Sequence, residues 1–192
     1  RINRFEGVWT DHEQGAMRHT GDVFDMAIKG KGFFSVQTPE GVQYTRNGNF
    51  SKSDQGQLVT PIGYPVLDQA GAPVTIPENY QRPEIDASGA VRVRDELLGE
   101  QTVIGQLQIV DFPELYDNNA AAQTPYQAPL RKGRDGLFIP HPATQQAPAE
   151  NFVISQGFLE ESNVQPVLEM VKMIDIFRCL LYTSPSPRDD EL

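Results

Sequence analysis

The chain has 192 residues, a formal net charge of −10 and a hydrophobic content of 39%. An acidic chain of this kind argues against binding to nucleic acid or to anionic membranes, which need basic surfaces. No apolar run reaches the roughly 18 residues that a membrane-spanning helix requires. One cysteine excludes an internal disulfide and a cysteine-based zinc site, and the 16 glycines and 15 prolines favour many short strands joined by turns.

The first part of the chain predicts a polar lead-in followed by β structure. Residues 1–20 are expected to form an irregular connecting segment, with Trp9 as an anchor onto a core, and the β-rich part is expected over 21–160. Gly30 and Gly32 flank a lysine and precede the first predicted strand, so a tight turn explains both glycines. A phosphate-binding loop would need a strand before it and a helix after it, and the sequence predicts neither.

A β-hairpin is predicted next, with strands at 33–38 and 42–46 and a turn at 39–41. The tripeptide Arg46-Asn47-Gly48 follows. It is either a plain hairpin turn or a binding loop, and the Asn-Gly pair favours the turn.

Short strand patterns then recur at intervals of about ten residues, which is typical of an antiparallel barrel or sandwich and not of βαβ units. These patterns lie at 57–60, 64–67, 73–77, 84–86, 90–93, 105–110 and 152–155. The stretch 105–110 has the clearest alternation, with Leu107 and Ile109 on one face. Residues 113–149 are rich in Pro, Ala and Gln and are predicted to be loops, with one short strand at 137–139. The predicted fold is mainly β: an antiparallel barrel or sandwich-like core.

An amphipathic helix is expected over 161–178. Ser162 and Asn163 offer an N-cap at its start. Its apolar residues recur at spacings of three and four, as in a coiled-coil seam. They are Val164, Val167, Val171 and Ile174, with Leu168 widening the stripe.

The tail at 179–192 breaks this pattern. Pro185 and Pro187 would end any helix. We interpret the tail as foreign sequence joined to the chain, so Cys179 is given no redox role.

The sequence offers little for enzyme chemistry. Asp11, His12, Glu13 and His19 could suggest a metal site, but they lie on a stretch without predicted structure, and solvated surface is the better interpretation. His141 is interpreted as a loop residue between two prolines, and no serine has a credible paired base. We therefore predict no catalytic residue, no cofactor and no metal. A β-rich ligand-binding module and a hydrolase that uses Asp and His19 remain as rival classes.

Four segments, in order along the chain, resemble the flagellar basal-body rod and hook family. Residues 21–34 are similar to its G-x-x-x-D-x-A-I-x-G-x-G-F-F signature, and 44–50 to Y-T-R-x-G-x-F. Residues 56–67 match G-x-L-V-T-x-x-G-Y-P-V-L, and 156–164 match Q-G-x-L-E-x-S-N-V. The motif positions are Asp25, Gly30, Gly32, Phe33, Arg46, Gly48, Gly157, Glu160, Ser162 and Asn163.

The resemblance implies a structural subunit without enzymatic activity. Residues 130–138 and 167–174 fit the proximal rod members best, with distal rod and hook members as alternatives. The implied partners are other rod subunits, without nucleic acid, a small-molecule substrate or membrane insertion. The implied location is the periplasmic rod, reached through the flagellar type III export apparatus. The family also implies an N-terminal helix before Arg1 that would pair with 161–178, so we expect that segment to be frayed, or packed opportunistically, when alone.

Overall fold

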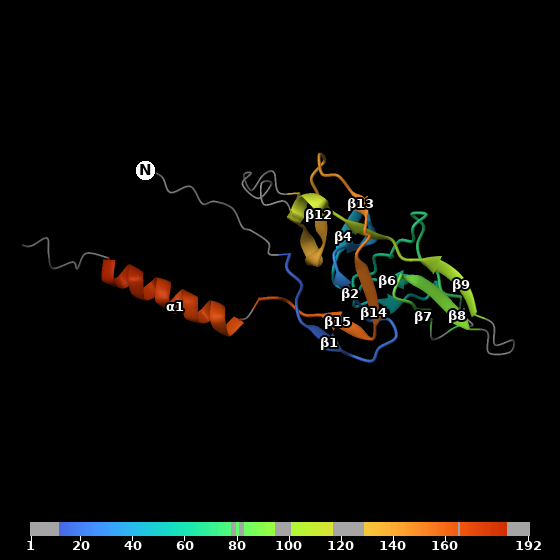
Figure 1. The fold of residues 1–192 in the computed structure, drawn as a ribbon, viewed down its shortest axis with the longest axis horizontal. Coiled ribbons are helices and arrows are strands. Elements are labelled where there is room, and N and C mark those ends of the chain that lie inside the picture. The colour runs from blue at the N-terminus through green and yellow to red at the C-terminus, as the bar shows by residue number, and fades with distance from the viewer. Residues whose placement is uncertain are drawn as a thin grey trace, which may run out of the picture. The chain divides into compact units, whose positions relative to one another are not determined.

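A computed structural model describes residues 12–77, 80, 83–94, 101–116, 129–164 and 166–183. The chain divides into two units, Arg1–Glu161 and Ser162–Leu192. The first unit contains all the described strands, and every pairing between them is antiparallel. The second contains the one α-helix of the described residues (Figure 1). The predicted class, a mainly β antiparallel core with a C-terminal helix, is confirmed.

The largest sheet has six strands in the order β11-β12-β4-β3-β10-β13. The strands are β3 Phe33–Thr38, β4 Gly41–Thr45, β10 Ile109–Asp111, β11 Leu130–Lys132, β12 Phe138–Pro140 and β13 Ala147–Pro148. The predicted hairpin is confirmed, with Thr38 opposite Gly41 across the turn. Gly41 has φ +119°, a conformation that a side chain would make costly.

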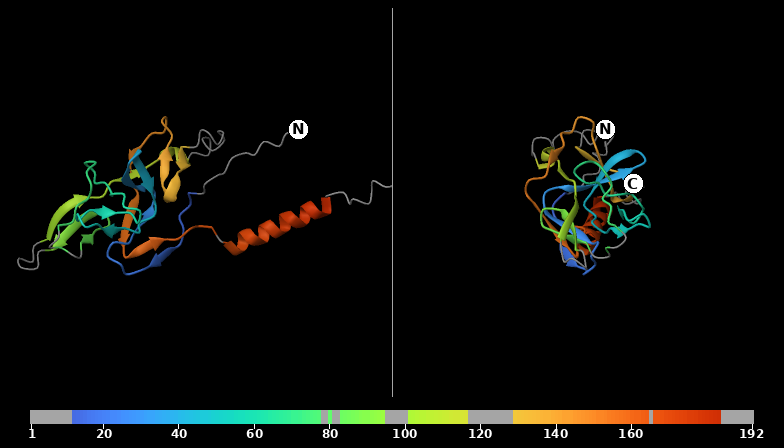
Figure 2. Two further views of the ribbon diagram at one scale, coloured as in Figure 1. Left: turned by 180° about the vertical axis from the view of Figure 1, so that it is seen from behind. Right: turned by 90° about the vertical axis from the view of Figure 1, so that its right-hand side faces the viewer.

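Four smaller sheets complete the first unit. Three of them have two strands: β1 Met17–His19 with β15 Phe158–Glu160, β2 Met26–Gly30 with β14 Phe152–Gln156, and β5 Ser51–Lys52 with β6 Leu58–Val59. The fourth has three strands, β7 Glu84–Ile85, β8 Ala90–Arg94 and β9 Gln101–Gln106. Sheet β7-β8-β9 and hairpin β11–β12 lie toward opposite ends of this unit (Figures 1 and 2). Because β1 pairs with β15, the first and last strands of the unit meet.

The sheets enclose one large core and one smaller cluster. Phe34, Met26 and Ile28 lie fully buried in the large core, where Phe34 makes an edge-to-face contact with Phe50. The smaller cluster is built around Phe33 and contains Phe112, Tyr44, Val110 and Leu130. Because Phe33 and Phe34 are adjacent in strand β3, they point to opposite faces of the sheet and serve one cluster each.

The predicted strand at 105–110 is wrong as a single element. Leu107 and Ile109 are both buried, as the alternation indicated, but the chain leaves β9 at Gln106 and enters β10 at Ile109. The amide of Leu107 donates to the carbonyl of Gly89, whereas that of Gln108 donates to Leu67. These two residues carry the chain from one sheet into another, so the alternation spans two strands.

The predicted loops at 113–149 are also partly wrong. The described part of this stretch contains β11, β12 and β13 and the short 3-10 helices Pro113–Tyr116 and Arg134–Gly136. The predicted strand at 137–139 corresponds to β12.

The N-terminal segment also differs from its prediction. Strand β1 lies inside residues 1–20, for which no regular structure was expected, and it is held in place by its pairing with β15 and not by local propensity. Trp9 and Asp11 lie outside the described residues.

Helix α1 spans Pro166–Thr183. It begins later than the predicted 161–178 segment and continues five residues beyond it before the prolines of the tail. Pro166 occupies the first position of the helix, where its missing N–H costs nothing. The foreign origin of 179–192 stays a prediction.

Candidate functional site

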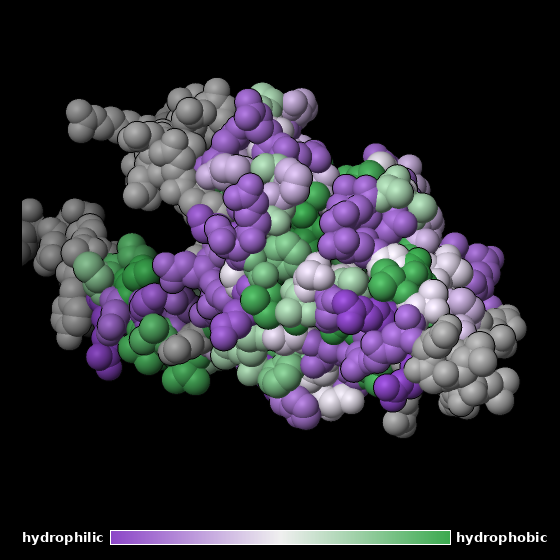
Figure 3. Space-filling view, turned by 45° about the vertical axis from the view of Figure 1, so that its right-hand side comes forward, coloured by the Kyte–Doolittle hydropathy of each residue, from purple (hydrophilic) through white to green (hydrophobic). Residues whose placement is uncertain are grey.

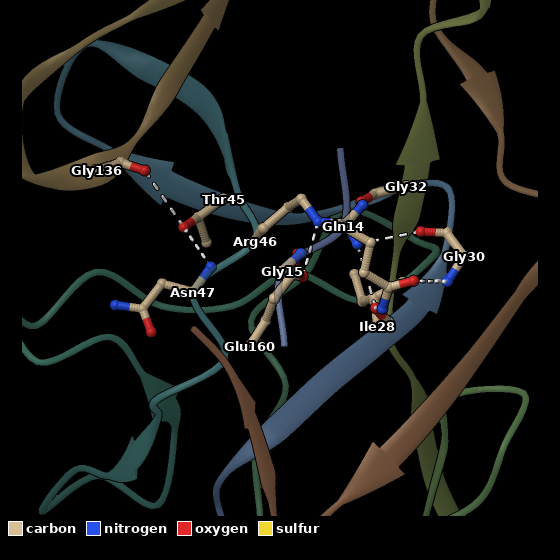
Figure 4. A network of polar contacts seen from close by, with 10 residues as sticks. All are labelled: Gln14, Gly15, Ile28, Gly30, Gly32, Thr45, Arg46, Asn47, Gly136 and Glu160. Carbon is tan, nitrogen blue, oxygen red and sulfur yellow. Dashed lines mark hydrogen bonds and ion pairs between the residues drawn. The ribbon is translucent and has the colours of Figure 1, made fainter. Parts of the chain in front are cut away.

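Arg46 is the centre of a dense polar contact in the first unit (Figure 4). Its Nε donates to a carboxylate oxygen of Glu160 at 2.9 Å. Its Nη1 donates to the carbonyl of Gly32 at 3.0 Å, and its Nη2 donates to the carbonyls of Ile28 at 3.2 Å and Gly30 at 3.1 Å. We call Arg46, Glu160 and these three carbonyls the Arg46 clamp.

The clamp is largely shielded from water. The side chains of Arg46 and Glu160 are 14% and 9% exposed. The guanidinium also lies 5.8 Å from the ring centroid of Phe33, within range of a cation–π interaction. A shielded ion pair stabilises a fold only when its other hydrogen-bonding groups are satisfied, and here each guanidinium nitrogen has an acceptor.

The clamp also holds the N-terminal strand segment. The second carboxylate oxygen of Glu160 accepts a hydrogen bond from the amide of Gly15 at 3.0 Å. The side chain of Gln14 donates to the carbonyl of Ile28 at 3.0 Å and accepts from the amide of Gly30 at 3.2 Å. The segments that lead into β1 and out of β15 are therefore fastened to the same turn between β2 and β3.

The two turn glycines are required by close packing. Gly30 and Gly32 have φ values of +104° and +126°. A Cβ on Gly32 would lie 2.6 Å from a methyl group of Ile109, and one on Gly30 would collide with the backbone carbonyl of Asn151. The predicted tight turn is therefore observed, and its free carbonyls bind Arg46.

Gly48 has a different role from the one predicted. Strand β4 pairs with β3 and β12, and β5 pairs with β6, so Asn47-Gly48 is not the turn of a hairpin. Instead Asn47 Oδ1 accepts from the amide of Asn49 at 3.1 Å, which bends the chain locally. A Cβ on Gly48 would collide with the carbonyl of Met26, so only glycine lets these backbones approach.

Gly157 joins β14, β15 and the start of β2. Its amide donates to the carbonyl of the buried Asp25 at 2.7 Å. Its carbonyl accepts from the amides of Thr20 at 2.8 Å and Gly21 at 3.1 Å. Since Gly157 has φ +77°, a larger residue would strain this crossing.

Gln156 is a structural residue that the site prediction missed. Its Nε2 donates to the carbonyls of Val23 at 2.7 Å and Pro83 at 2.9 Å, and its Oε1 accepts from the amide of Ile85 at 3.1 Å. It belongs to the Q-G-x-L-E motif, but its partners lie 71 residues or more away in the chain. Gln14 was also missed, because it lies in a stretch for which no regular structure was predicted.

Helix α1, in the second unit, has a broader apolar surface than the predicted stripe. The predicted residues are all exposed in the structure: Val164 57%, Val167 75%, Leu168 49%, Val171 49% and Ile174 53%. Five more apolar residues are exposed as well, namely Met170, Met173, Ile176, Phe177 and Leu180. Figure 3 shows hydrophobic and hydrophilic residues side by side on the molecular surface. Ahead of the helix, Ser162 Oγ accepts from the amide of Val164 at 3.2 Å, so Ser162 caps the turn before the helix proper.

The histidines lie in packed or turn positions. His12 contacts the rings of Phe33 and Phe138, and His19 lies edge-on to Phe158 at 4.9 Å. His141 Nδ1 accepts from the amide of Ala143 at 3.3 Å. Within the described ranges, no three His, Cys, Asp or Glu residues gather in a way that could hold a metal ion. The same part of the chain contains no helix with the length and apolar character needed to cross a membrane.

One shallow hollow of about 440 Å³ bears on the rival interpretation of a ligand-binding module. His19, Asp22, Glu84 and Arg94 lie on its wall together with backbone of Gly21 and Gly157. Its charged groups have mixed signs, and it lacks the apolar enclosure that is typical of a small-molecule site.

The structure brings together eight of the ten predicted motif residues in the first unit. Arg46, Glu160, Gly30, Gly32 and Phe33 meet in or against the Arg46 clamp. Asp25, Gly48 and Gly157 hold the start of β2 in place. Ser162 and Asn163 belong to the second unit and precede its helix.

Comparison with known proteins gives two matches to family models. Residues 27–93 match the flagellar hook protein FlgE/F/G D1 domain, and residues 155–178 match the C-terminal region of flagellar basal body rod FlgEFG proteins. Arg46 lies in the first match and Glu160 in the second. The clamp therefore joins the two matched segments.

Individual relatives agree with these matches. The flagellar basal-body rod protein FlgF of Mesorhizobium japonicum is 36% identical over 88% of this chain and 64% of its own length. The FlgF proteins of Caulobacter vibrioides and Rhizobium meliloti are 36% and 35% identical over 90% and 92% of this chain, and over 63% and 66% of their own lengths. Other relatives, 32–36% identical, are named FlgG. The chain thus spans a little under two thirds of these FlgF relatives.

Proposed function

Because this chain belongs to the family of flagellar rod and hook proteins, we propose that it is a structural subunit of the basal-body rod. It would assemble with other rod subunits into the tube that houses the export channel and transmits torque. The proposed location is the periplasmic part of the basal body, reached through the flagellar type III export apparatus. The proposed role is mechanical, without a catalytic step.

The observation that carries this proposal is the apolar surface of helix α1. Val167, Met170 and Phe177 are each more than half exposed, and polar residues such as Glu169 and Lys172 cover only part of the helix. A helix with apolar side chains around most of its surface is stable when other elements cover it. A subunit that packs its terminal helix among those of its neighbours would supply that cover.

Within the family, the proposal is the proximal rod position. It is supported by the three relatives named FlgF and by the fit of 130–138 and 167–174. The distal rod position is the alternative, because relatives named FlgG are also similar to this chain.

A domain exchange tests both the role as a rod subunit and the proximal position in the rod. Residues 12–178 would replace the matched region of FlgF, and separately of FlgG, in Caulobacter vibrioides strains that lack the respective gene. We expect the FlgF chimera to restore swimming in soft agar and to co-purify with basal bodies. Restoration by the FlgG chimera alone would move the chain to the distal rod, and failure of both would contradict the proposal.

The helix is tested within the working chimera. The double variant Val171→Asp, Ile174→Asp should abolish swimming, because two carboxylates on the apolar surface oppose its burial. The matched control, Glu169→Ala, changes an exposed polar position of the same helix and should swim normally. Normal swimming of the double variant would show that the apolar surface of the helix is not needed for assembly.

A further inference from the structure

Hairpin β11–β12 carries an exposed cationic patch on an otherwise acidic chain. The patch consists of Arg131 and Lys132 on β11 and Arg134 in the turn that follows. All three residues are exposed. We propose that this basic hairpin binds the carboxylate-bearing surface of a second copy of the chain, in a head-to-tail contact.

The three cations form no ion pair with other residues that the structure describes. Among the described residues, ion pairs occupy Arg18, Arg46, Arg92 and Lys172, and none involves the basic hairpin. The charges of the patch are therefore available to another surface.

The turn holds the patch in a fixed shape. The amide of Gly133 donates to the carbonyl of Leu137 at 2.7 Å, and the amide of Leu137 donates to Arg134 at 3.0 Å. Asp135 has φ +61°, the one positive value at a non-glycine position in the described part of the chain. A fixed turn lowers the entropy that a contact through Arg134 must overcome.

Charge identifies the occupant. Residues 131–135 contain three cations and one acid, a net charge of +2. Because the whole chain carries −10, the residues outside this segment carry −12. A second copy therefore offers mainly carboxylates to this patch, and complementary charge is what favours such an encounter.

Charge also sets the geometry of the contact. Two basic hairpins repel each other, so the contact cannot be a two-fold symmetric one in which the same patch meets itself. A patch that meets a different surface does so either reciprocally, in a closed dimer, or head-to-tail, in a heterologous contact; the heterologous contact, which extends into open chains unless it closes into a ring, is the one that the proposed rod subunit requires. Cations on an edge strand also oppose pairing between strand edges, so side chains would make the contact.

This inference rests on the proposed function, because it names a surface through which rod subunits would meet. Its test is sedimentation velocity of the full chain at low and high salt. We expect the wild type to form species larger than dimers at low salt and to dissociate at high salt, where exposed charges are screened.

A matched pair of variants separates the patch from overall charge. Arg131→Glu with Arg134→Glu reverses the patch and should weaken association about tenfold or more. Lys29→Glu with Arg94→Glu makes the same change in net charge at two other exposed cations and should associate as the wild type does. Equal weakening by both pairs would overturn the inference.

Mixing the proteins gives a second readout that a folding defect could not produce. The patch-reversed variant keeps its acidic surface, so it should accept a wild-type hairpin and add no further copy. Small amounts should therefore shorten wild-type assemblies, whereas an inert variant would leave them unchanged and overturn the proposal.

Two further outcomes would also overturn the inference. A wild type that stays monomeric at both salt concentrations, or that binds vesicles containing phosphatidylserine without associating with itself, would overturn the inference. If the FlgF chimera still swam in that case, the proposed function would stand and only the assignment of this surface would fail.

Discussion

The guanidinium of Arg46 lies 2.9 Å from the carboxylate of Glu160, although 114 residues separate them in the chain. The contact closes the first unit between the end of β4 and the end of β15, immediately before the segment that leads to helix α1. It therefore fixes both chain ends of the β unit to one turn.

Removing Arg46 is expected to destabilise the β unit strongly. Arg46→Ala leaves Glu160 shielded and unpaired and leaves three backbone carbonyls without this donor, which should cost about 3–5 kcal/mol of unfolding free energy. Urea denaturation followed by circular dichroism measures the loss. Arg18→Ala is the control, because its pair with Glu161 is about half exposed and should contribute less than about 1 kcal/mol. Equal effects of the two variants would contradict the importance of the clamp.

Gly48 should not tolerate a methyl group. In Gly48→Ala the added Cβ meets the carbonyl of Met26, so the backbones must separate, and we expect a loss of about 3 kcal/mol. Gly105→Ala is the matched control, because a Cβ there has nothing within 4 Å. The control should stay within about 1 kcal/mol of the wild type. Thermal unfolding distinguishes them, and a neutral Gly48→Ala would show that this close approach is not rigid.

Gln156 is expected to matter for its side-chain amide. Gln156→Ala removes three hydrogen bonds to the backbone of Val23, Pro83 and Ile85, which should cost about 2–3 kcal/mol. Gln106→Ala removes one exposed bond at 3.4 Å and should cost about 0.5 kcal/mol or less. Hydrogen exchange should locate the Gln156→Ala effect at β7. Unchanged protection at β7 would show that the hydrogen bond between Gln156 and Ile85 does not stabilise this strand.

The turn between β7 and β8 should respond to acid. The hydroxyl of Ser88, at 2.6 Å, is the main cause that lowers the pKa of Asp86 below its usual value, followed by backbone amides and Arg92. Because the folded-state pKa is lower than the unfolded one, the stabilisation is present above the unfolded pKa and is lost as pH falls through the folded pKa. In Ser88→Ala, NMR titration should find a higher pKa for Asp86. An unchanged value would assign the shift to the other partners.

Local sequence features determined the elements that depend on neighbouring residues. The hairpin of β3 and β4 was predictable because a turn signal separates two strand patterns of matching length. Helix α1 was predictable from its spacing of valines, and the four motifs identified the family before any geometry was known. The apolar residues Met170 and Phe177 were missed because they lie beside the predicted stripe, not in it.

Tertiary structure decided everything that depends on distant partners. Strands β11 and β13 have weak local propensity and are ordered by ladders with β12 and β10. The sequence placed Arg46 and Glu160 in separate motifs, and only the folded chain brings them together. Gly48 must be glycine because the carbonyl of Met26, 22 residues earlier in the chain, packs against its Cα. Turn chemistry and periodicity act over a few residues, whereas burial and hydrogen bonding act wherever the chain meets itself, and that meeting is what one sequence alone does not specify.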